Sequence, residues 1–261
     1  MIVVALPELA LPLDECAAVL APLLGCTLYE SRLRLSAGIP AVVLTTADPA
    51  RAQAIAAALQ QRGQRALVCD ASSAVSSRAM VPMKRFQLAS DAIVGGAQNE
   101  QTLPYADILA IFRALHREQI DASTLSKSTT FSAGRAVLTG GLVMTKSQTT
   151  AAQKTSEAQE QVLYLFRRSG QTPWLLQESQ TQYQGLGARL QPTTTANFQA
   201  TLQLLREKAP GAVYDERLMK VRKMVEQAVR GTAGGNLQVT SSTASSTDLY
   251  AHLMALALAG A

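Results

Sequence analysis

The sequence predicts an α+β protein built from two small modules and followed by C-terminal helices. In the first 70 residues, short β-branched runs alternate with stretches whose apolar side chains have helical spacing, whereas strand-like runs dominate residues 79–208. A run of small residues, Ala71 to Ser77, separates the two regions. We therefore expect one domain at 1–70, a linker at 71–78 and a second domain at 79–208.

The first module is expected to hold four strands and two helices. Arg32 and Arg34 alternate with Leu33 and Leu35, which predicts a strand with one buried face. Asp48 followed by a proline predicts the start of the second helix. The elements in order are strand 2–6, helix 13–24, strand 27–35, strand 41–44, helix 49–62 and strand 66–69. This β-α-β-β-α-β order is that of a ferredoxin-like sandwich. A receiver-like parallel sheet is the alternative, but its strands should be continuously apolar.

The second module reads as a β-rich domain with two helices. We expect, in order, strands 80–88 and 92–94, a helix at 106–117, long strands at 131–145 and 162–168 joined by a polar loop at 146–160, a strand at 173–178 and a helix after the Thr193 to Thr195 cap.

Three segments of this module resemble the plan of bacterial PH-like or GRAM-like domains. They are the Leu-Pro-Tyr-Ala-Asp-Ile stretch at 103–108, the strand containing 163–166 with the Trp174 strand after it, and the final helix with Asn197 and Phe198. The resemblance covers 79–208 and departs from the family at the helix expected at 106–117, where such domains have a tight turn or a short insertion. It implies an interaction module that binds phosphoinositides, proteins or no known ligand, and it implies no chemistry.

The C-terminal region is expected to mediate association. Apolar residues at 209–230 repeat at spacings of 4, 3, 4 and 3, so this segment is predicted to be an amphipathic helix, either a coiled-coil-like seam or a helix docked on the second domain. A flexible tether at 231–247 and an apolar helix at 248–261 follow. The predicted partner-binding residues are Leu218, Val221, Val225, Leu249, Leu253 and Leu256. The last helix is expected to dock on its own fold or on a neighbouring subunit, with lipid as the competing target.

The net charge of +5 arises after residue 78. Short basic clusters there provide a candidate site for an anionic ligand or headgroup, namely Lys84, Arg85, Arg167 and Arg168. The charge is too dispersed for a nucleic-acid interface, which concentrates Lys and Arg with interleaved aromatic side chains.

The residues that carry catalysis in common enzyme classes are sparse. The two histidines, His116 and His252, lie in no nucleophile-elbow context, and His116 is expected at the surface of a helix. The three cysteines, Cys16, Cys26 and Cys69, lack the spacing of a zinc site. We expect no enzyme, no cofactor and no metal. The absence of a leader-like start and of a long apolar segment predicts a cytoplasmic protein.

These observations favour a non-catalytic cytoplasmic protein that mediates interaction or assembly, with self-association as its expected partnership. A peripheral protein of anionic membranes is the first alternative, supported by the basic clusters and the apolar tail. A small-molecule sensor acting through the ferredoxin-like module is the second. An oligomeric mass would separate the first of these classes from the others most directly.

Overall fold

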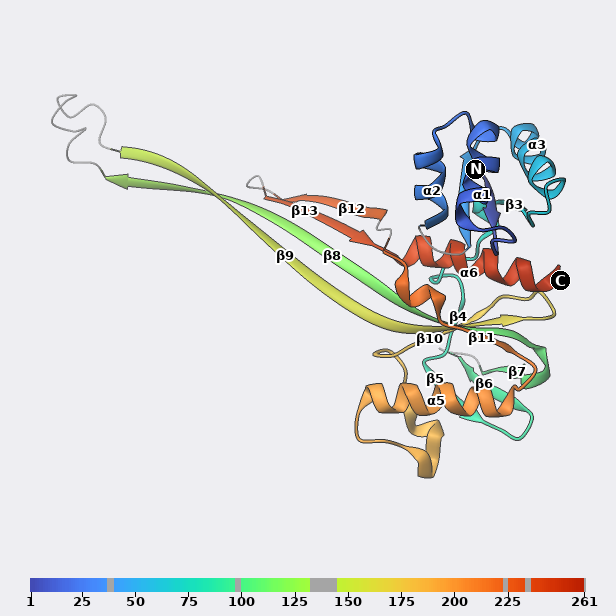
Figure 1. The fold of residues 1–261 in the computed structure, drawn as a ribbon. Helices are drawn as coiled ribbons and strands as arrows, with labels where there is room; N and C mark the ends of the chain where they lie inside the picture. The colour runs from blue at the N-terminus through green and yellow to red at the C-terminus, as the bar shows by residue number, and fades with distance from the viewer. Residues whose placement is uncertain (37–39, 97–99, 132–144, 223–224, 233–235, 261) are drawn as a thin grey trace. The chain divides into compact units, whose positions relative to one another are not determined.

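The computed structural model describes residues 1–36, 40–96, 100–131, 145–222, 225–232 and 236–260. The chain forms two compact units. The first comprises Met1–His116, Glu160–Lys223 and Ala244–Ala261, and the second comprises Arg117–Gln159 and Met224–Thr243. Helices and antiparallel sheets occur together, so the chain has an α+β fold (Figure 1). The predicted boundary at 71–78 lies inside the first unit, and a domain border there stays a prediction.

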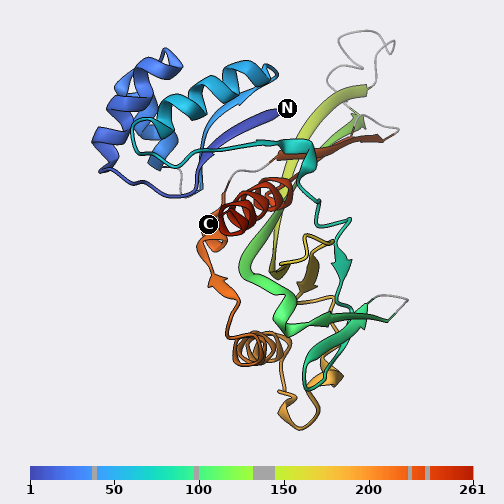
Figure 2. The ribbon, with the colours of Figure 1, turned by 90° about the vertical axis from the view of Figure 1, so that its right-hand side faces the viewer.

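The N-terminal part of the first unit is a three-stranded antiparallel sheet in the order β2-β1-β3, with three helices against one face (Figure 2). Val4 and Leu6 of β1 point to the helices, while Val3 and Ala5 point to the opposite face. Asp48 caps α3 as predicted, accepting hydrogen bonds from the backbone N–H groups of Ala50 and Arg51. The elements are β1 (Ile2–Leu6), α1 (Leu13–Leu24), α2 (Leu28–Ser36), β2 (Ala41–Thr46), α3 (Pro49–Gln60) and β3 (Leu67–Asp70).

The strand predicted at 27–35 is wrong, because this segment is the helix α2. Thr27 and Glu30 form a capping box: the Thr27 N–H donates to Glu30 Oε2 at 2.7 Å, and the Glu30 N–H donates to Thr27 Oγ1 at 3.2 Å. Ser31 and Leu35, four residues apart, are the buried side chains, whereas Leu33 is 60% exposed. The module is therefore β-α-α-β-α-β with three strands, and the four-stranded ferredoxin-like arrangement does not form.

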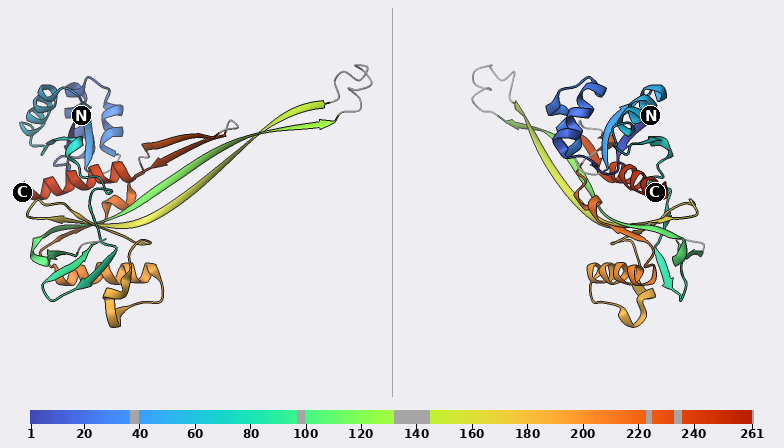
Figure 3. Two further views of the ribbon diagram at one scale, coloured as in Figure 1. Left: turned by 180° about the vertical axis from the view of Figure 1, so that it is seen from behind. Right: turned by 45° about the vertical axis from the view of Figure 1, so that its right-hand side comes forward.

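The central part of the first unit is a sheet covered by a helix on each face. Along β9, Leu163 and Leu165 point into a core shared with α5, while Val162, Tyr164 and Phe166 point into a core shared with α6. This period of two is the strand repeat, and it divides the apolar residues between two layers. The views agree that α5 and α6 lie on opposite sides of these strands (Figure 3). The elements are β4 (Val81–Pro82), β8 (Ile108–Phe131), β9 (Thr145–Arg167), β10 (Trp174–Gln177), α5 (Thr194–Lys208), β11 (Val213–Asp215) and α6 (Ala244–Ala259).

A second small sheet completes this part. Its strands run in the order β5-β6-β7 and are antiparallel, and a 3-10 segment, η3, lies beside β5. The bounds are β5 (Arg85–Leu88), β6 (Ala92–Gly96), β7 (Gln101–Pro104) and η3 (Tyr183–Arg189). The predicted strands at 92–94 and 173–178 and the Thr193-capped helix are confirmed.

The helix predicted at 106–117 is wrong, since a 3-10 turn, η2 (Tyr105–Asp107), leads directly into β8. Pairing with β11 favours the strand over the helix, because Val213, Tyr214 and Asp215 lie opposite residues 110–112 of β8. The polar loop predicted at 146–160 belongs to β9. The strand predicted at 131–145 lies almost wholly outside the described residues.

The second unit contains strand segments in the order β12-β13-β8-β9. Leu237 of β13 lies opposite Ser123 of β8, and Ser242 lies opposite Glu118. The helix predicted at 209–230 is wrong, because its residues form β11, η4 (Arg217–Lys220) and β12 (Val225–Thr232). The flexible tether predicted at 231–247 is also wrong where it is described, since β13 (Asn236–Ser242) pairs with β12 and β8. The tail helix is confirmed, and it begins at Ala244.

Candidate functional site

Helix α6 lies in the interior of the first unit between two sheets. Leu253 is fully buried against Val3, Ala5 and Cys69 of the N-terminal sheet. On the other side Met254 and its neighbours pack against β8 and β9. Arg65 also donates a hydrogen bond to the carbonyl of Ala257. The predicted docking of this helix is therefore satisfied within the chain's own fold.

Most of the predicted partner-binding residues are buried or half-buried by this packing. Leu218 and Leu253 are buried within the chain and are not available to a separate partner. Val221 and Leu249 are partly buried against the same cores. Leu256 and Val225 remain exposed, at 37% and 39%. Of the six residues, Leu256 and Val225 are thus the exposed ones, and their role in partner binding stays a prediction.

A buried chain of polar groups holds the start of α6. Tyr164 Oη donates to Asp248 Oδ1 at 2.7 Å, and the backbone N–H of Ser77 donates to Asp248 Oδ2 at 2.8 Å. His116 Nε2 lies 2.6 Å from Tyr164 Oη. Because the single hydroxyl proton of Tyr164 goes to Asp248, His116 Nε2 must carry a proton and donate it. The chain thus runs from β8 through β9 to α6.

Burial sets the titration of two members of this chain. Burial lowers the pKa of His116, while the negative charges of Asp248 and Glu160 act in the opposite direction. Burial and the adjacent Asp248 raise the pKa of Tyr164 well above its ordinary value. His116 is bonded to a tyrosine rather than to a serine or cysteine, and its expected place on a helix surface is wrong. We assign the hydrogen-bonded series His116, Tyr164 and Asp248 a structural role: it fixes the position of α6.

The basic residues predicted as an anion site are largely engaged within the fold. Arg167 Nε donates to Asp107 Oδ2 at 2.6 Å, and both side chains are mostly buried. Arg168 donates to the carbonyl of Gly211 at 2.6 Å. Lys84 is exposed. Arg85 lies elsewhere, at a pocket. Arg167 and Arg168 thus have partners within the fold, and binding of an anionic ligand or membrane by the four residues stays a prediction.

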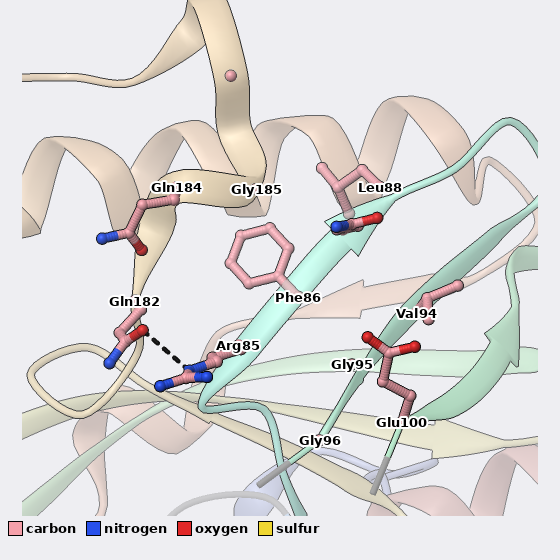
Figure 4. A pocket seen from close by; sticks show the side chains of 12 residues that line it. Arg85, Phe86, Leu88, Val94, Gly95, Gly96, Glu100, Gln182, Gln184 and Gly185 are labelled. Carbon is pink, nitrogen blue, oxygen red and sulfur yellow. Dashed lines mark hydrogen bonds between the residues drawn. The ribbon is translucent and has the colours of Figure 1, made fainter. Parts of the chain in front are cut away.

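A pocket of about 730 Å³ lies beside β5 and β6 (Figure 4). Arg85 and Glu100 contribute its charged groups, and Arg85 Nε donates to Gln182 Oε1 at 3.1 Å. Its remaining lining consists of Phe86, Gln87, Leu88, Val94, Gly95, Gly96, Gln182, Gln184, Gly185 and Gly187. Such a volume is typical of small-ligand sites. The small-molecule alternative was placed in the N-terminal module, and this pocket is not part of it.

Two glycines shape the wall of this pocket. A Cβ at Gly185 would collide with the carbonyl group of Phe86, and a Cβ at Gly95 would collide with the carbonyl oxygen of Arg85. Glycine at these positions allows η3 and β6 to approach β5 closely. The sequence reasoning missed the pocket, because the glycines and the glutamines become neighbours only through strand pairing.

Few of the side chains described in the second unit are buried. On β9, residues 155–159 are all exposed, so both faces of the strand meet solvent. Among the side chains described in this unit, the buried ones are the polar Ser242 and Thr243. Cross-strand polar contacts link its strands, as between Thr155 Oγ1 and Asp121 Oδ1 at 2.7 Å.

Comparison with protein-family models, curated proteins and solved structures finds no match for this chain. In the described ranges, no helix has both the length and the apolar character needed to cross a membrane. Within the same ranges, His, Cys, Asp and Glu side chains form no group of three or more able to hold a metal ion.

Proposed function

We propose that this chain is a non-catalytic protein of interaction and assembly that pairs with a second copy of itself through the sheet of its second unit. The observation that carries the proposal is the exposure of both faces of β9 at 155–159. A sheet that contains such a solvent-exposed strand is marginally stable there, because strand pairing alone barely offsets the entropy of ordering the chain. Such a sheet gains stability from a partner.

The free edge of β9 favours another strand as that partner. Pairing with β10 uses β9 only from Val162 to Leu165, and β9 is the outer strand of the second unit's sheet. Among the described strands, none pairs with this edge at residues 145–160, so its backbone groups are open along roughly 50 Å of strand. Such an edge recruits a further strand through main-chain hydrogen bonds. A copy of the same edge, turned antiparallel by a two-fold axis, is complementary to it.

Two finer assignments belong to this proposal. We assign residues 79–208 to a PH-like module, supported by β8 replacing the helix that departed from that plan and by α5 packing against the sheet. We also place the protein in the cytoplasm, supported by its three free cysteines, which are typical of a reducing compartment.

Sedimentation velocity of the full chain over a range of concentrations tests the assembly. The wild type should show a dimer that dissociates on dilution. Proline, which lacks a backbone N–H, is introduced at Ser156 in one variant and at Glu157 in another. Neighbouring N–H groups of a strand point to opposite edges, so one of the two variants removes an N–H from the free edge of β9. One of the two variants should lose the dimer while keeping the melting temperature that the wild type shows when it is diluted to the monomer. Ser156→Ala, which keeps the N–H, should remain dimeric.

A wild-type chain that stays monomeric at all concentrations would refute self-assembly. Dimers of unchanged stability in both proline variants would exclude the β9 edge. Sedimentation with vesicles containing phosphatidylserine separates the membrane alternative: binding by a monomeric chain would favour that function instead.

A further inference from the structure

We infer that the pocket beside β5 and β6 binds a short peptide with free termini, a dipeptide or tripeptide, with its carboxylate at Arg85 and its ammonium group at Glu100. This site is independent of the sheet edge in the second unit, and all its lining residues belong to the first unit.

The strand register places the two charges on opposite sides of β6. Arg85 of β5 lies opposite Gly96 of β6, and Gly95 lies opposite Gln101 of β7. Glu100 directly precedes Gln101 along the chain. Arg85 and Glu100 therefore lie on the two sides of the Gly95–Gly96 end of β6, and two strand spacings place their Cα atoms about 10 Å apart.

The glycines at this end of β6 leave the space between the charges open. Figure 4 shows the side chains of Arg85 and Glu100 on either side of the Gly95 and Gly96 backbone. Gly96 has φ 149°, a conformation that side-chain-bearing residues rarely adopt. The gap is thus built into the backbone.

Neither charge is neutralised within the described chain. The partner of Arg85 is Gln182, whose carboxamide is uncharged. Neither Arg85 nor Glu100 takes part in the ion pairs found among the described residues. A cation and an anion held apart across one cavity complement a ligand that carries both charges.

The distance between Arg85 and Glu100 and the residues that line the pocket indicate which class of zwitterion fits. A free α-amino acid carries both charges on one carbon, so it is too short to span the separation between Arg85 and Glu100. Each residue of an extended peptide adds about 3.3 to 3.6 Å, so two or three residues match the distance. The carboxamides of Gln87, Gln182 and Gln184 each provide a donor and an acceptor for peptide groups, and Val94 offers an apolar contact.

Isothermal titration of the full chain with Ala-Ala and Ala-Ala-Ala tests this inference. Saturable binding is expected for at least one of them. N-acetyl-Ala-Ala and Ala-Ala amide, which each lack one charge, should bind at least about tenfold more weakly than Ala-Ala. Binding of all forms with equal affinity, or no saturable binding of the unmodified peptides at millimolar concentration, would overturn the inference.

Matched variants locate the binding. Arg85→Gln and Glu100→Gln should each weaken binding about tenfold, and Val94→Trp, which fills the cavity, should abolish it. Arg51→Gln and Glu8→Gln change exposed residues outside the pocket lining and should bind like the wild type. Equal affinity in Arg85→Gln, Glu100→Gln and the wild type would place the peptide elsewhere and refute this site.

Discussion

The substitution Tyr164→Phe removes one hydroxyl group and should weaken the packing of α6 against the rest of the first unit. Tyr164 is fully buried, and its Oη both donates to Asp248 and accepts from His116. Phenylalanine keeps the ring and its packing. It leaves one carboxylate oxygen of Asp248 and the Nε2–H of His116 without this partner in a buried setting.

The expected loss follows from these contacts. A hydrogen bond to a charged group contributes about 1.5 to 3 kcal/mol, and a buried donor left unpaired costs about 1 to 3 kcal/mol. We expect Tyr164→Phe to lower the free energy of unfolding by about 3 kcal/mol. For a protein of this size that corresponds to a fall in Tm of roughly 6 to 12 °C.

Urea unfolding followed by tryptophan fluorescence measures this change. The single tryptophan, Trp174, is fully buried in β10, which pairs with β9 beside Tyr164. Tyr250→Phe is the matched control, since Tyr250 lies on α6 and its hydroxyl makes no hydrogen bond among the described residues; it should stay within about 0.5 kcal/mol of wild type. Asp248→Ala and the double variant complete a cycle with an expected coupling of about 1.5 kcal/mol or more. Equal stability of Tyr164→Phe and Tyr250→Phe would refute the role of the polar chain.

Three further outcomes are expected. Leu253→Ala should cost about 2 to 5 kcal/mol in chemical unfolding, while Leu256→Ala, on the exposed side of the same helix, should cost less than about 1 kcal/mol; equal losses would contradict the docked position of α6. Gly185→Ala should destabilise by about 1 to 3 kcal/mol through collision with the β5 backbone, and Gly211→Ala, which meets only a flexible side-chain end, should be close to neutral by thermal melting. Because burial lowers the pKa of His116, the unfolded chain takes up its proton first as pH falls below 6.5, so stability should decline in that direction; His116→Gln should flatten this part of the pH profile, and an unchanged profile would exclude His116 as its source.

Local patterns identified those elements whose ends and burial are encoded by neighbouring residues. The Asp48-Pro49 start predicted α3, and the Thr193 cap predicted α5, because both signals act within one helical turn. The apolar run after Asp248 predicted a helix that must be buried, and α6 is one. In each case the local propensity and the tertiary packing favour the same structure.

The secondary-structure prediction failed where one sequence fits both the strand periodicity and the helix periodicity of apolar residues. Residues 27–35 satisfy an alternation of two, but Ser31 and Leu35 also lie on one helix face, and the capping box at Thr27 favours the helix. Residues 209–230 have a heptad-like spacing, yet they form β11, η4 and β12, because β8 and β13 offer edges to pair with. β-propensity depends on such partners, which a single sequence does not display.

By itself, then, the sequence determined the α+β class, the well-capped helices and the need to bury the last helix, because these depend on composition and on contacts within one or two turns. Tertiary structure alone decided where that helix docks, and it brought together His116, Tyr164 and Asp248, which are 48 and 84 residues apart in successive steps. It also placed Arg85 and Glu100 on the two sides of the Gly95–Gly96 end of β6, through the register of three strands. Such groupings arise from strand pairing and helix docking between distant segments, and no local pattern of residues encodes them.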